Sequence, residues 1–363
     1  MKNIILFTGF PGFLGSELLP RVLTRAPEAR AVCLVQGKFA DLAQKRRLDL
    51  ETEQPELAGR VELAQGDITL PDLGLDDPET LLADTVEIFH LAAVYDLMVK
   101  REVGLAVNVE GTQNILNFAE ECPRLERLHY VSTCFVSGRH AGIYSEDDLD
   151  KGQEFNNYYE ETKFLAEVEV QTRMSQGLPV SIYRPPIVVG DSVTGATQKY
   201  DGPYFIIRWL LRQPSLAILP SVGDPEAVRV NLVPRDFVVR AIAHLSGLEE
   251  SAGQIYQLAD SHPLTVAALI DAVARETHRK VVRVPLPRFA AKAAIDYVPG
   301  VYRLMQIPSA AIDYFVHPTH YTSVNTVRDL AGTDIEVPRL ETYLGRLVDF
   351  TRAHPEVGSA AMA

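Results

Sequence analysis

Residues 4–15 read Ile-Ile-Leu-Phe-Thr-Gly-Phe-Pro-Gly-Phe-Leu-Gly, a short apolar run followed by three evenly spaced glycines. The apolar run predicts a buried strand, and Leu14–Arg25 carries apolar residues at helical spacing. Gly9, Gly12 and Gly15 suit a tight turn, close approach of the backbone to a pyrophosphate, and packing of the helix on the strand. The start of the helix adds N–H groups and the positive end of its dipole. A glycine-rich turn without a ligand is the alternative, but the flanking strand and helix favour a dinucleotide site.

The rest of the chain alternates short apolar runs with longer segments of helical periodicity, which is typical of an α/β fold. Continuous apolar runs are expected of parallel strands that are covered on both faces. Five further strands are predicted on this basis: Ala31–Val35, Val61–Gln65, Ile88–Leu91, Leu128–Ser132 and Val180–Tyr183. Asn108–Glu121 and Tyr159–Gln176 are predicted as crossover helices. The expected fold is therefore a doubly wound parallel sheet.

The composition changes after Gly190, where glycine, proline and tyrosine cluster in residues 191–204 and prolines punctuate residues 214–225. We interpret this part of the chain as a smaller, mostly helical cap that binds the substrate. The expected organisation is a dinucleotide-binding domain of residues 1–189 and about 229–260, with a cap of about 190–228 and 261–355. The residues after Glu356 are expected to be frayed.

The overall composition excludes several classes of protein. Among the 363 residues, 47% are hydrophobic and 23% charged, close to the averages for folded globular proteins. The excess of 48 acidic over 35 basic residues gives a net charge of −13, which disfavours nucleic acid and anionic membrane as partners. Cys33, Cys122 and Cys134 are odd in number and contain no CxxC, so neither a disulfide framework nor a metal site is expected, and a cytoplasmic location fits best. No apolar run approaches the ~18 residues of a membrane span.

The end of the second predicted strand bears on the choice of dinucleotide. An acidic residue that binds the ribose hydroxyls of NAD usually stands there, whereas this chain has Gln36-Gly37-Lys38. Lys38, or the two arginines downstream, can meet a 2′-phosphate, so NADP is favoured and NAD is the alternative. Asp67 and Ile68, after the third strand, are expected beside the adenine. The alternative is that Asp67 only stabilises an ordinary turn, which would give the same sequence pattern.

Tyr159 and Lys163 lie four residues apart on a predicted helix and therefore share one face. A nearby ammonium lowers the pKa of a phenol, which would make Tyr159 a usable proton donor or acceptor. Ser132 and Thr133 end the fifth predicted strand, at the sheet edge where ligands of such folds bind, and Thr133 can hydrogen-bond a substrate carbonyl. A chance YxxxK and hydroxyls that only cap the backbone are the alternatives. The glycine turn, the Ser-Thr pair and the YxxxK together favour an active site.

These three elements, in this order and at this spacing, resemble the extended short-chain dehydrogenase/reductase family over most of the chain. The resemblance implies a Rossmann fold and NAD(P), with Tyr159 as general acid and base, Lys163 as its activator and Thr133 polarising the substrate oxygen. It also implies that Asn108 supports the active site. The implied cofactor-binding residues are Thr8, Gly9, Phe10, Pro11, Gly12, Phe13, Leu14, Gly15, Gln36, Lys38, Asp67, Ile68, Leu91, Ala92, Ala93, Asn108, Val131, Ser132, Tyr159, Lys163, Pro185, Ile187 and Val188.

A narrower resemblance is to the fatty acyl-CoA reductase and thioester reductase branch. It rests on Gly66–Leu75, on Val131-Ser132-Thr133, and on Ile187–Gly190 followed by Asp191–Gly195. That branch usually carries arginine where this chain has Gln36, which leaves the 2′-phosphate contact open. No carrier or adenylation domain is visible in the sequence, so a thioester is expected to arrive as a CoA ester or on a separate protein.

The expected function is NAD(P)H-dependent reduction of a carbonyl or acyl thioester in a largely apolar small molecule. Gly202–Leu211 and Phe289–Met305 are candidates to line an acyl tunnel, with burial in the core as the alternative. Three arginines of the cap are candidates to meet a CoA or carrier phosphate, with ordinary solvation as the alternative: Arg208, Arg212 and Arg229.

Other functions remain open at this point. A sugar-nucleotide epimerase or dehydratase on the same scaffold would keep NAD tightly bound, and a hydroxysteroid-type dehydrogenase is a near relative of the leading interpretation. A non-catalytic dinucleotide-sensing protein is the alternative from another class, against which Thr133, Tyr159 and Lys163 argue. The family resemblance also implies a homodimer formed through the helices Asn108–Glu121 and Tyr159–Gln176.

Overall fold

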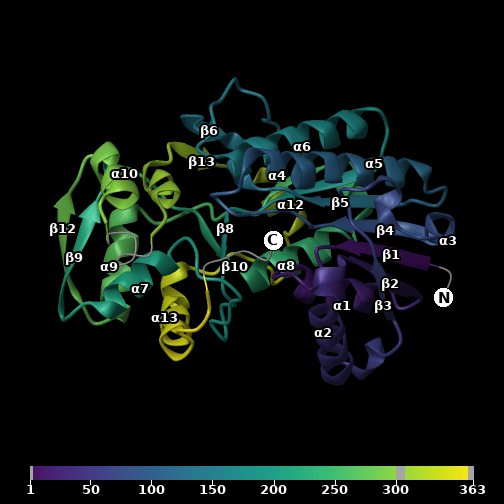
Figure 1. The fold of residues 1–363 in the computed structure, drawn as a ribbon, viewed down its shortest axis with the longest axis horizontal. Coiled ribbons are helices and arrows are strands. Elements are labelled where there is room, and N and C mark those ends of the chain that lie inside the picture. The colour runs from purple at the N-terminus through teal and green to yellow at the C-terminus, as the bar shows by residue number, and fades with distance from the viewer. Residues whose placement is uncertain (1–2, 300–306, 359–363) are drawn as a thin grey trace.

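The computed structural model describes residues 3–299 and 307–358. Its centre is a seven-stranded sheet of parallel strands in the order β11-β7-β5-β4-β1-β2-β3 (Figure 1). The chain runs outward from β1 through β2 to β3 and then returns to β4 on the other side of β1. This reversal of strand order confirms the expected doubly wound Rossmann sheet. The strands are β1 (Asn3–Thr8), β2 (Ala29–Val35), β3 (Val61–Gln65), β4 (Thr85–His90), β5 (Arg127–Val131), β7 (Val180–Arg184) and β11 (Ile255–Gln257).

Helices cover both faces of this sheet, and the side chains of β1 alternate between them. Ile5 and Phe7 pack into the hydrophobic core that includes helices α1 and α8, whereas Ile4 and Leu6 pack into the core that includes α5 and α6. Figure 1 shows these two helical layers above and below the strands. One layer contains α1 (Gly15–Arg25), α2 (Ala40–Glu53) and α8 (Arg235–Leu245), and the other contains α3 (Pro78–Asp84), α4 (Arg101–Gly104), α5 (Gly111–Glu121) and α6 (Tyr158–Ser175).

The structure corrects several predicted boundaries. Strand β4 ends at His90 and β5 at Val131, so Leu91 and Ser132 belong to the turns that follow. The helix predicted to begin at Asn108 instead starts at Arg101 and passes through a π-helical turn, Leu105–Glu110, before α5. Strand β11 was not predicted, because three residues are too short to give a periodic signal.

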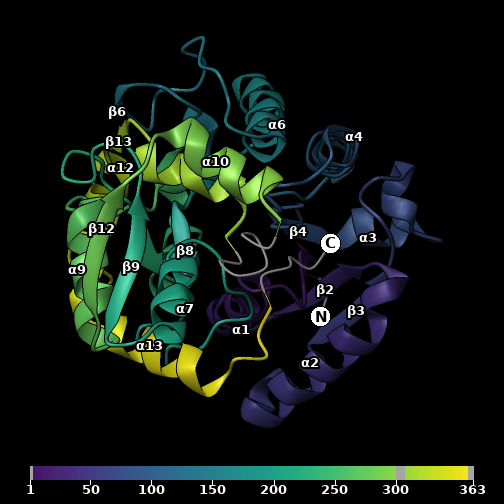
Figure 2. The ribbon, with the colours of Figure 1, turned by 60° about the vertical axis from the view of Figure 1, so that its left-hand side comes forward.

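The second part of the molecule has its own small sheet and core (Figure 2). Strand β9 (Leu216–Ser221) pairs in parallel with β12 (Lys280–Pro285), beside the helices α7 (Tyr204–Arg212), α9 (Val266–Glu276), α10 (Arg288–Tyr297) and α13 (Leu344–Ala353). Short pairs join the two parts: β8 (Ile187–Val189) with β10 (Leu232–Pro234), and β6 (Gly142–Tyr144) with β13 (Thr319–Tyr321), which α12 (Val324–Asp329) follows. Within the described residues, no helix has the length and apolar character that a membrane crossing requires.

Candidate active site

A cavity of about 460 Å³ opens at the carboxyl ends of the central strands. Turns that follow β1, β2, β3, β4, β5 and β7 all contribute to its wall, as expected for the ligand site of a doubly wound sheet. The wall includes every residue that the family resemblance implies for the cofactor and for catalysis except Asn108. Arg46 and Arg47, the two arginines considered for a 2′-phosphate, do not line it. Most of the remaining wall comes from residues after β4 and from the cap.

The glycine turn at the end of β1 forms one side of this cavity. Gly9 has a φ of +85°, and a Cβ there would lie 2.9 Å from the backbone nitrogen of Ala92. A Cβ on Gly12 or Gly15 would lie 2.7 or 2.6 Å from the carbonyl oxygen of Gly9, so each of the three positions excludes a side chain. Helix α1 begins at this turn without a side-chain cap. Its N-terminus therefore fits the pyrophosphate of a dinucleotide.

Thr8 holds the turn after β4 against the glycine turn. Its Oγ1 accepts hydrogen bonds from the backbone N–H groups of Leu91 and Ala92, at 3.2 and 3.1 Å. The same oxygen lies 2.7 Å from Nδ1 of His90. Burial lowers the pKa of His90 to about 3, so the imidazole is neutral at physiological pH. Thr8 thus shapes the cavity, with its hydroxyl already bonded to protein groups.

One polar cluster lies where β2 and β3 end. Gln36 donates a hydrogen bond from Nε2 to Oδ2 of Asp67 at 2.7 Å, and both the N–H and the hydroxyl of Thr69 donate to Oδ1. Burial raises the pKa of Asp67, but the hydrogen bonds from Thr69 and Gln36 and the charge of Lys38 outweigh this effect and lower it overall. An ionised carboxylate and the exposed ammonium of Lys38 therefore stand at this end of the cavity.

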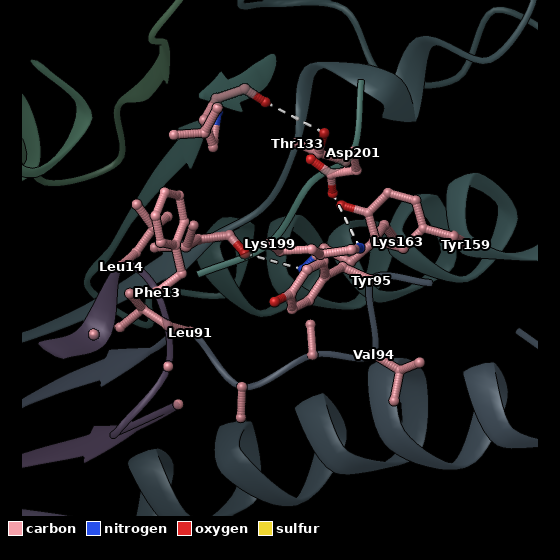
Figure 3. Close-up of a pocket in the computed structure, with 18 of the residues that line it drawn as sticks. Phe13, Leu14, Leu91, Val94, Tyr95, Thr133, Tyr159, Lys163, Lys199 and Asp201 are labelled. Carbon is pink, nitrogen blue, oxygen red and sulfur yellow. Dashed lines mark hydrogen bonds and ion pairs between the residues drawn. The ribbon is translucent and has the colours of Figure 1, made fainter. Parts of the chain in front are cut away.

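Thr133 and Tyr159 meet at the middle of the cavity (Figure 3). Thr133 follows β5 and donates a hydrogen bond from Oγ1 to the carbonyl oxygen of Pro185 at 3.3 Å. Tyr159 lies in the first turn of α6, and burial raises its pKa more than a hydrogen bond with Thr133 lowers it. The expected lowering of this pKa by Lys163 is wrong for the cofactor-free protein, because burial dominates and the lysine's own hydrogen bonds lead elsewhere.

Lys163 is buried, and its Nζ donates to the hydroxyl of Tyr130 at 2.9 Å and to the carbonyl oxygen of Val131 at 3.0 Å. Burial lowers the pKa of Lys163 to about 7, against the opposing charge of Glu167. Glu167 in turn pairs with Arg184 at 2.5 Å and accepts a hydrogen bond from Ser132. This buried network fixes α6 against the end of β5 and engages the hydroxyl of Ser132 before any ligand binds.

Asn108 lies in the π-helical turn and is buried away from the cavity wall. Its Oδ1 accepts from the N–H of Val94 at 2.9 Å, and its Nδ2 donates to the carbonyl oxygen of Val94 and to Thr162. Asn108 therefore does not line this cavity, and its predicted contact with the cofactor stays a prediction. Its role in the structure is to hold the segment after β4, whose side chains do line the cavity.

The substrate side of the cavity is mostly apolar and was largely missed by the sequence analysis. Its wall includes Val94, Tyr95, Leu97, Val103, Val107, Phe135, Val230, Leu269, Ala311, Tyr314 and Phe315, with Lys199 and Asp201 as charged members. The segment after β4 could have been found, since it continues from a strand end that was already assigned to the cofactor. The other residues come from distant parts of the chain and carry no local signal.

Most described residues of the two candidate tunnel segments do not line the cavity. Of Gly202–Leu211, only Gly202 and Pro203 line the cavity, because the apolar side chains of α7 are buried in the core of the cap. No described residue of Phe289–Met305 lines it, and residues 300–305 lie outside the part of the chain that the structure describes. The alternative interpretation, burial of these side chains in the core, is therefore the one that the structure shows for α7.

A second cavity of about 240 Å³ adjoins the first. Phe135, Ile187, Val230 and Tyr314 line both, so they separate the two spaces. The wall of the second cavity contains Arg229 and three histidines, and within the described residues no carboxylate. Arg208 and Arg212 line neither cavity. Of the three arginines considered for a phosphate, Arg229 alone lies on a described cavity wall.

A doubly wound sheet whose glycine turn, strand-end threonine and YxxxK pair meet at one cavity defines the class of extended short-chain dehydrogenases/reductases, which are NAD(P)-binding oxidoreductases. Within this class, the chain belongs to the male sterility protein family, whose sequence profile matches residues 7–242. The narrower resemblance to acyl-CoA and thioester reductases agrees with this membership.

Known proteins similar to the chain come from two settings. The chain is 31% identical to a linear gramicidin synthase of Brevibacillus parabrevis over 280 residues, which cover 74% of this chain and 5% of that protein. It is 28% identical to the fatty acyl-CoA reductase wat of Drosophila melanogaster over 279 residues, which cover 66% of this chain and 53% of that enzyme. The crystal structure of the terminal R domain from the myxalamid PKS-NRPS pathway matches with a TM-score of 0.81 and 29% identity, covering 97% of this chain and 91% of that one. The chain thus spans only part of the first two proteins.

Proposed function

We propose that this protein reduces an acyl thioester, or the corresponding aldehyde, with NADPH as the hydride donor. The observation that carries the proposal is that Thr133 and Tyr159 line one cavity together with the glycine turn and an apolar wall. The family membership and the similarity to a fatty acyl-CoA reductase and to a terminal R domain support the same reaction.

The chain's own residues would align the carbonyl and supply its proton. A bound dihydronicotinamide supplies a hydride to the carbonyl carbon. Thr133 would donate a hydrogen bond to the carbonyl oxygen, and Tyr159 would give that oxygen its proton as the negative charge develops. With a thioester, the resulting hemithioacetal loses the thiol and leaves an aldehyde. Because the pKa of Tyr159 is raised, its phenol stays in the proton-donating form at neutral pH.

The identity of the cofactor and of the acyl group are further parts of the proposal. Lys38 lines the cavity just after β2, and its positive charge supports NADP. NAD remains the alternative, because the neighbouring Gln36 is hydrogen-bonded to Asp67 and offers no positive charge to a 2′-phosphate. The apolar wall formed by the segment after β4 and by the cap supports a largely apolar acyl chain.

The decisive test follows single-turnover loss of NADPH absorbance with a long-chain acyl-CoA in one reaction and the matching aldehyde in another, with NADH in parallel. Oxidation with the acyl-CoA would establish thioester reduction, and oxidation with the aldehyde alone would restrict the protein to carbonyl reduction. Inactivity with both would overturn the proposal. Sugar nucleotides and hydroxysteroids would then be tested, and NAD that stays bound through gel filtration would favour the epimerase or dehydratase alternative.

The proposed assembly is a homodimer through α5 and α6. Sedimentation that gives only a monomer at micromolar concentration would contradict it, and the reaction proposed above does not depend on it.

A further inference from the structure

An ion pair from the cap lies beside the catalytic tyrosine. Nζ of Lys199 lies 3.0 Å from Oδ2 of Asp201, and the same Nζ stands 4.5 Å from the centroid of the Tyr95 ring. Both charged residues line the cavity, and Figure 3 shows the pair next to the ring of Tyr159. The Lys199 side chain is 13% exposed and that of Asp201 34% exposed. The pair therefore lies on the same cavity wall as the tyrosine and stays partly exposed to solvent.

This arrangement contrasts with the surroundings of Lys163. The ammonium of Lys163 donates to Tyr130 and to the carbonyl of Val131, and Lys163 and Tyr130 are both buried. Hydrogen bonds from Lys163 therefore lead into the interior of the protein. The reaction leaves Tyr159 without its proton after each turnover, and Lys199 offers a proton from the side of the cavity that meets solvent.

Placing this ion pair in the cavity also costs free energy of folding, and a functional role would explain why the pair is there. An ammonium and a carboxylate that are partly removed from water in an apolar cavity lose hydration, which their mutual attraction only partly offsets. The carboxylate of Asp201 also raises the pKa of Tyr159, together with Glu160 and Tyr95. An unpaired carboxylate there would tend to favour return of the proton and oppose its release, so the ammonium partner matters for the reaction.

We propose that Lys199 restores the proton of Tyr159 between turnovers and that Asp201 positions Lys199 for this transfer. The inference rests on the function proposed above. In the restoring step an N–H bond of the Lys199 ammonium breaks and the O–H bond of Tyr159 forms, either directly or through one water molecule. The neutral amine of Lys199 then takes a proton from solvent, so the chain returns to its starting state.

The test separates the first turnover from later ones. Lys199→Met is expected to slow the first turnover by about twofold to threefold, because the unpaired carboxylate of Asp201 makes Tyr159 a weaker acid. It is expected to lower the steady-state rate by about a further tenfold or more, because the proton of Tyr159 is no longer restored. Added methylammonium should restore part of the steady-state rate. Lys151→Met, which breaks an exposed lysine–aspartate pair outside the cavity, is the matched control and should change neither rate. A steady-state rate that stays within twofold of the wild type would overturn the proposal.

A second variant separates proton transfer from charge alone. Lys199→Arg keeps the positive charge and the ion pair, but a guanidinium does not release its proton near neutral pH. We expect this variant to be as slow in the steady state as Lys199→Met. A wild-type steady-state rate in Lys199→Arg would mean that the charge is sufficient and would overturn the role of Lys199 as proton donor.

A third measurement does not require turnover. Tyr159 is replaced by 3,5-difluorotyrosine, whose phenol titrates nearer neutral pH, and the titration is followed by fluorine NMR. Asp201→Asn is expected to lower this pKa, and Lys199→Met to raise it by leaving the carboxylate of Asp201 unpaired. Shifts in both directions would support the inference even if no substrate were reduced, in which case only the proposed function fails. Unchanged titration in both variants would overturn the inference whatever the activity.

Discussion

In the proposed reaction Tyr159 carries the proton transfer, so its hydroxyl is the single group whose removal should affect the reaction most. Tyr159→Phe deletes one oxygen from a partly buried ring and keeps the packing of the first turn of α6. We expect kcat to fall by about 100- to 10,000-fold, the usual contribution of a positioned acid. The dissociation constant of NADPH, measured by fluorescence titration, should stay nearly the same. A variant that keeps its full rate would remove Tyr159 from the mechanism.

Under the proposed function, Gln36 is the residue expected to set how well the site distinguishes NADPH from NADH. Its amide is bonded to Asp67, and neither side chain offers a positive charge to a 2′-phosphate. Gln36→Arg adds a guanidinium at this position, and one charged hydrogen bond contributes roughly 1.5–3 kcal/mol. The ratio of NADPH to NADH affinity should therefore rise by about tenfold or more. Gln54→Arg, at a half-buried position after α2 that lies outside the cavity wall, controls for charge alone, and an equal rise in that variant would contradict the argument.

At the scale of single residues, the sequence predicted the cofactor side of the cavity better than the substrate side. Gly9, Gly12 and Gly15 were predictable because a turn that excludes every Cβ leaves only glycine at a fixed spacing. The position of Asn108 off the cavity wall was not predictable, since a sequence does not show that its amide bonds to the backbone of Val94. Lys199 and Tyr314 were missed because only the folded cap brings them to the cavity.

Helix α6 contains a buried lysine that lowers the stability of the cofactor-free protein. The folded-state pKa of Lys163, about 7, lies below the value of about 10.4 for an unfolded lysine, so the unfolded state binds more protons between these values. Stability therefore rises with pH across this window, and the cost of burial is complete only below about pH 7. Lys163→Met should stabilise the cofactor-free protein at about pH 6 by roughly 1–2 kcal/mol, and less at about pH 10.

The measurement is thermal unfolding at both pH values, with Lys151→Met as the exposed control. Tyr130, which loses its partner in the variant, is left with a hydrogen bond to Thr112. A Lys163→Met variant that is less stable than the wild type at pH 6 would show that the contacts with Tyr130 and Val131 outweigh the cost of desolvation.

Among the elements, predictability follows length and burial. Strands such as β1 and β2 are covered by helices on both faces, so each contains a continuous apolar run. Strands β6, β8, β10, β11 and β13 have three residues each and give no such signal. The π-helical turn Leu105–Glu110 was also hidden, because its side chains keep a nearly helical pattern while the backbone gains a wider turn.

At the scale of the whole molecule, the sheet and the cap together enclose two adjoining cavities, and the second is suited to the polar arm of a thioester. Arg229 lies between β9 and β10, on the wall of the second cavity, and donates a hydrogen bond to the carbonyl oxygen of Pro263 at 2.8 Å. A guanidinium has further donors that can meet a phosphate. If the CoA moiety occupies this cavity while the carbonyl reaches Thr133, the loss of Arg229 should weaken binding of the thioester and leave the chemical step unchanged.

Arg229→Ala should therefore raise KM for a long-chain acyl-CoA by about tenfold, since a charged hydrogen bond contributes roughly 1.5–3 kcal/mol, without a matching change in kcat. KM for the matching aldehyde, which has no phosphate, should stay the same, and the effect on the thioester should shrink at high salt. Arg212→Ala removes an arginine that lines neither cavity and is the control. Equal effects on thioester and aldehyde would mean that Arg229 supports the shape of the cap, and no effect on either would place the thiol arm outside this cavity.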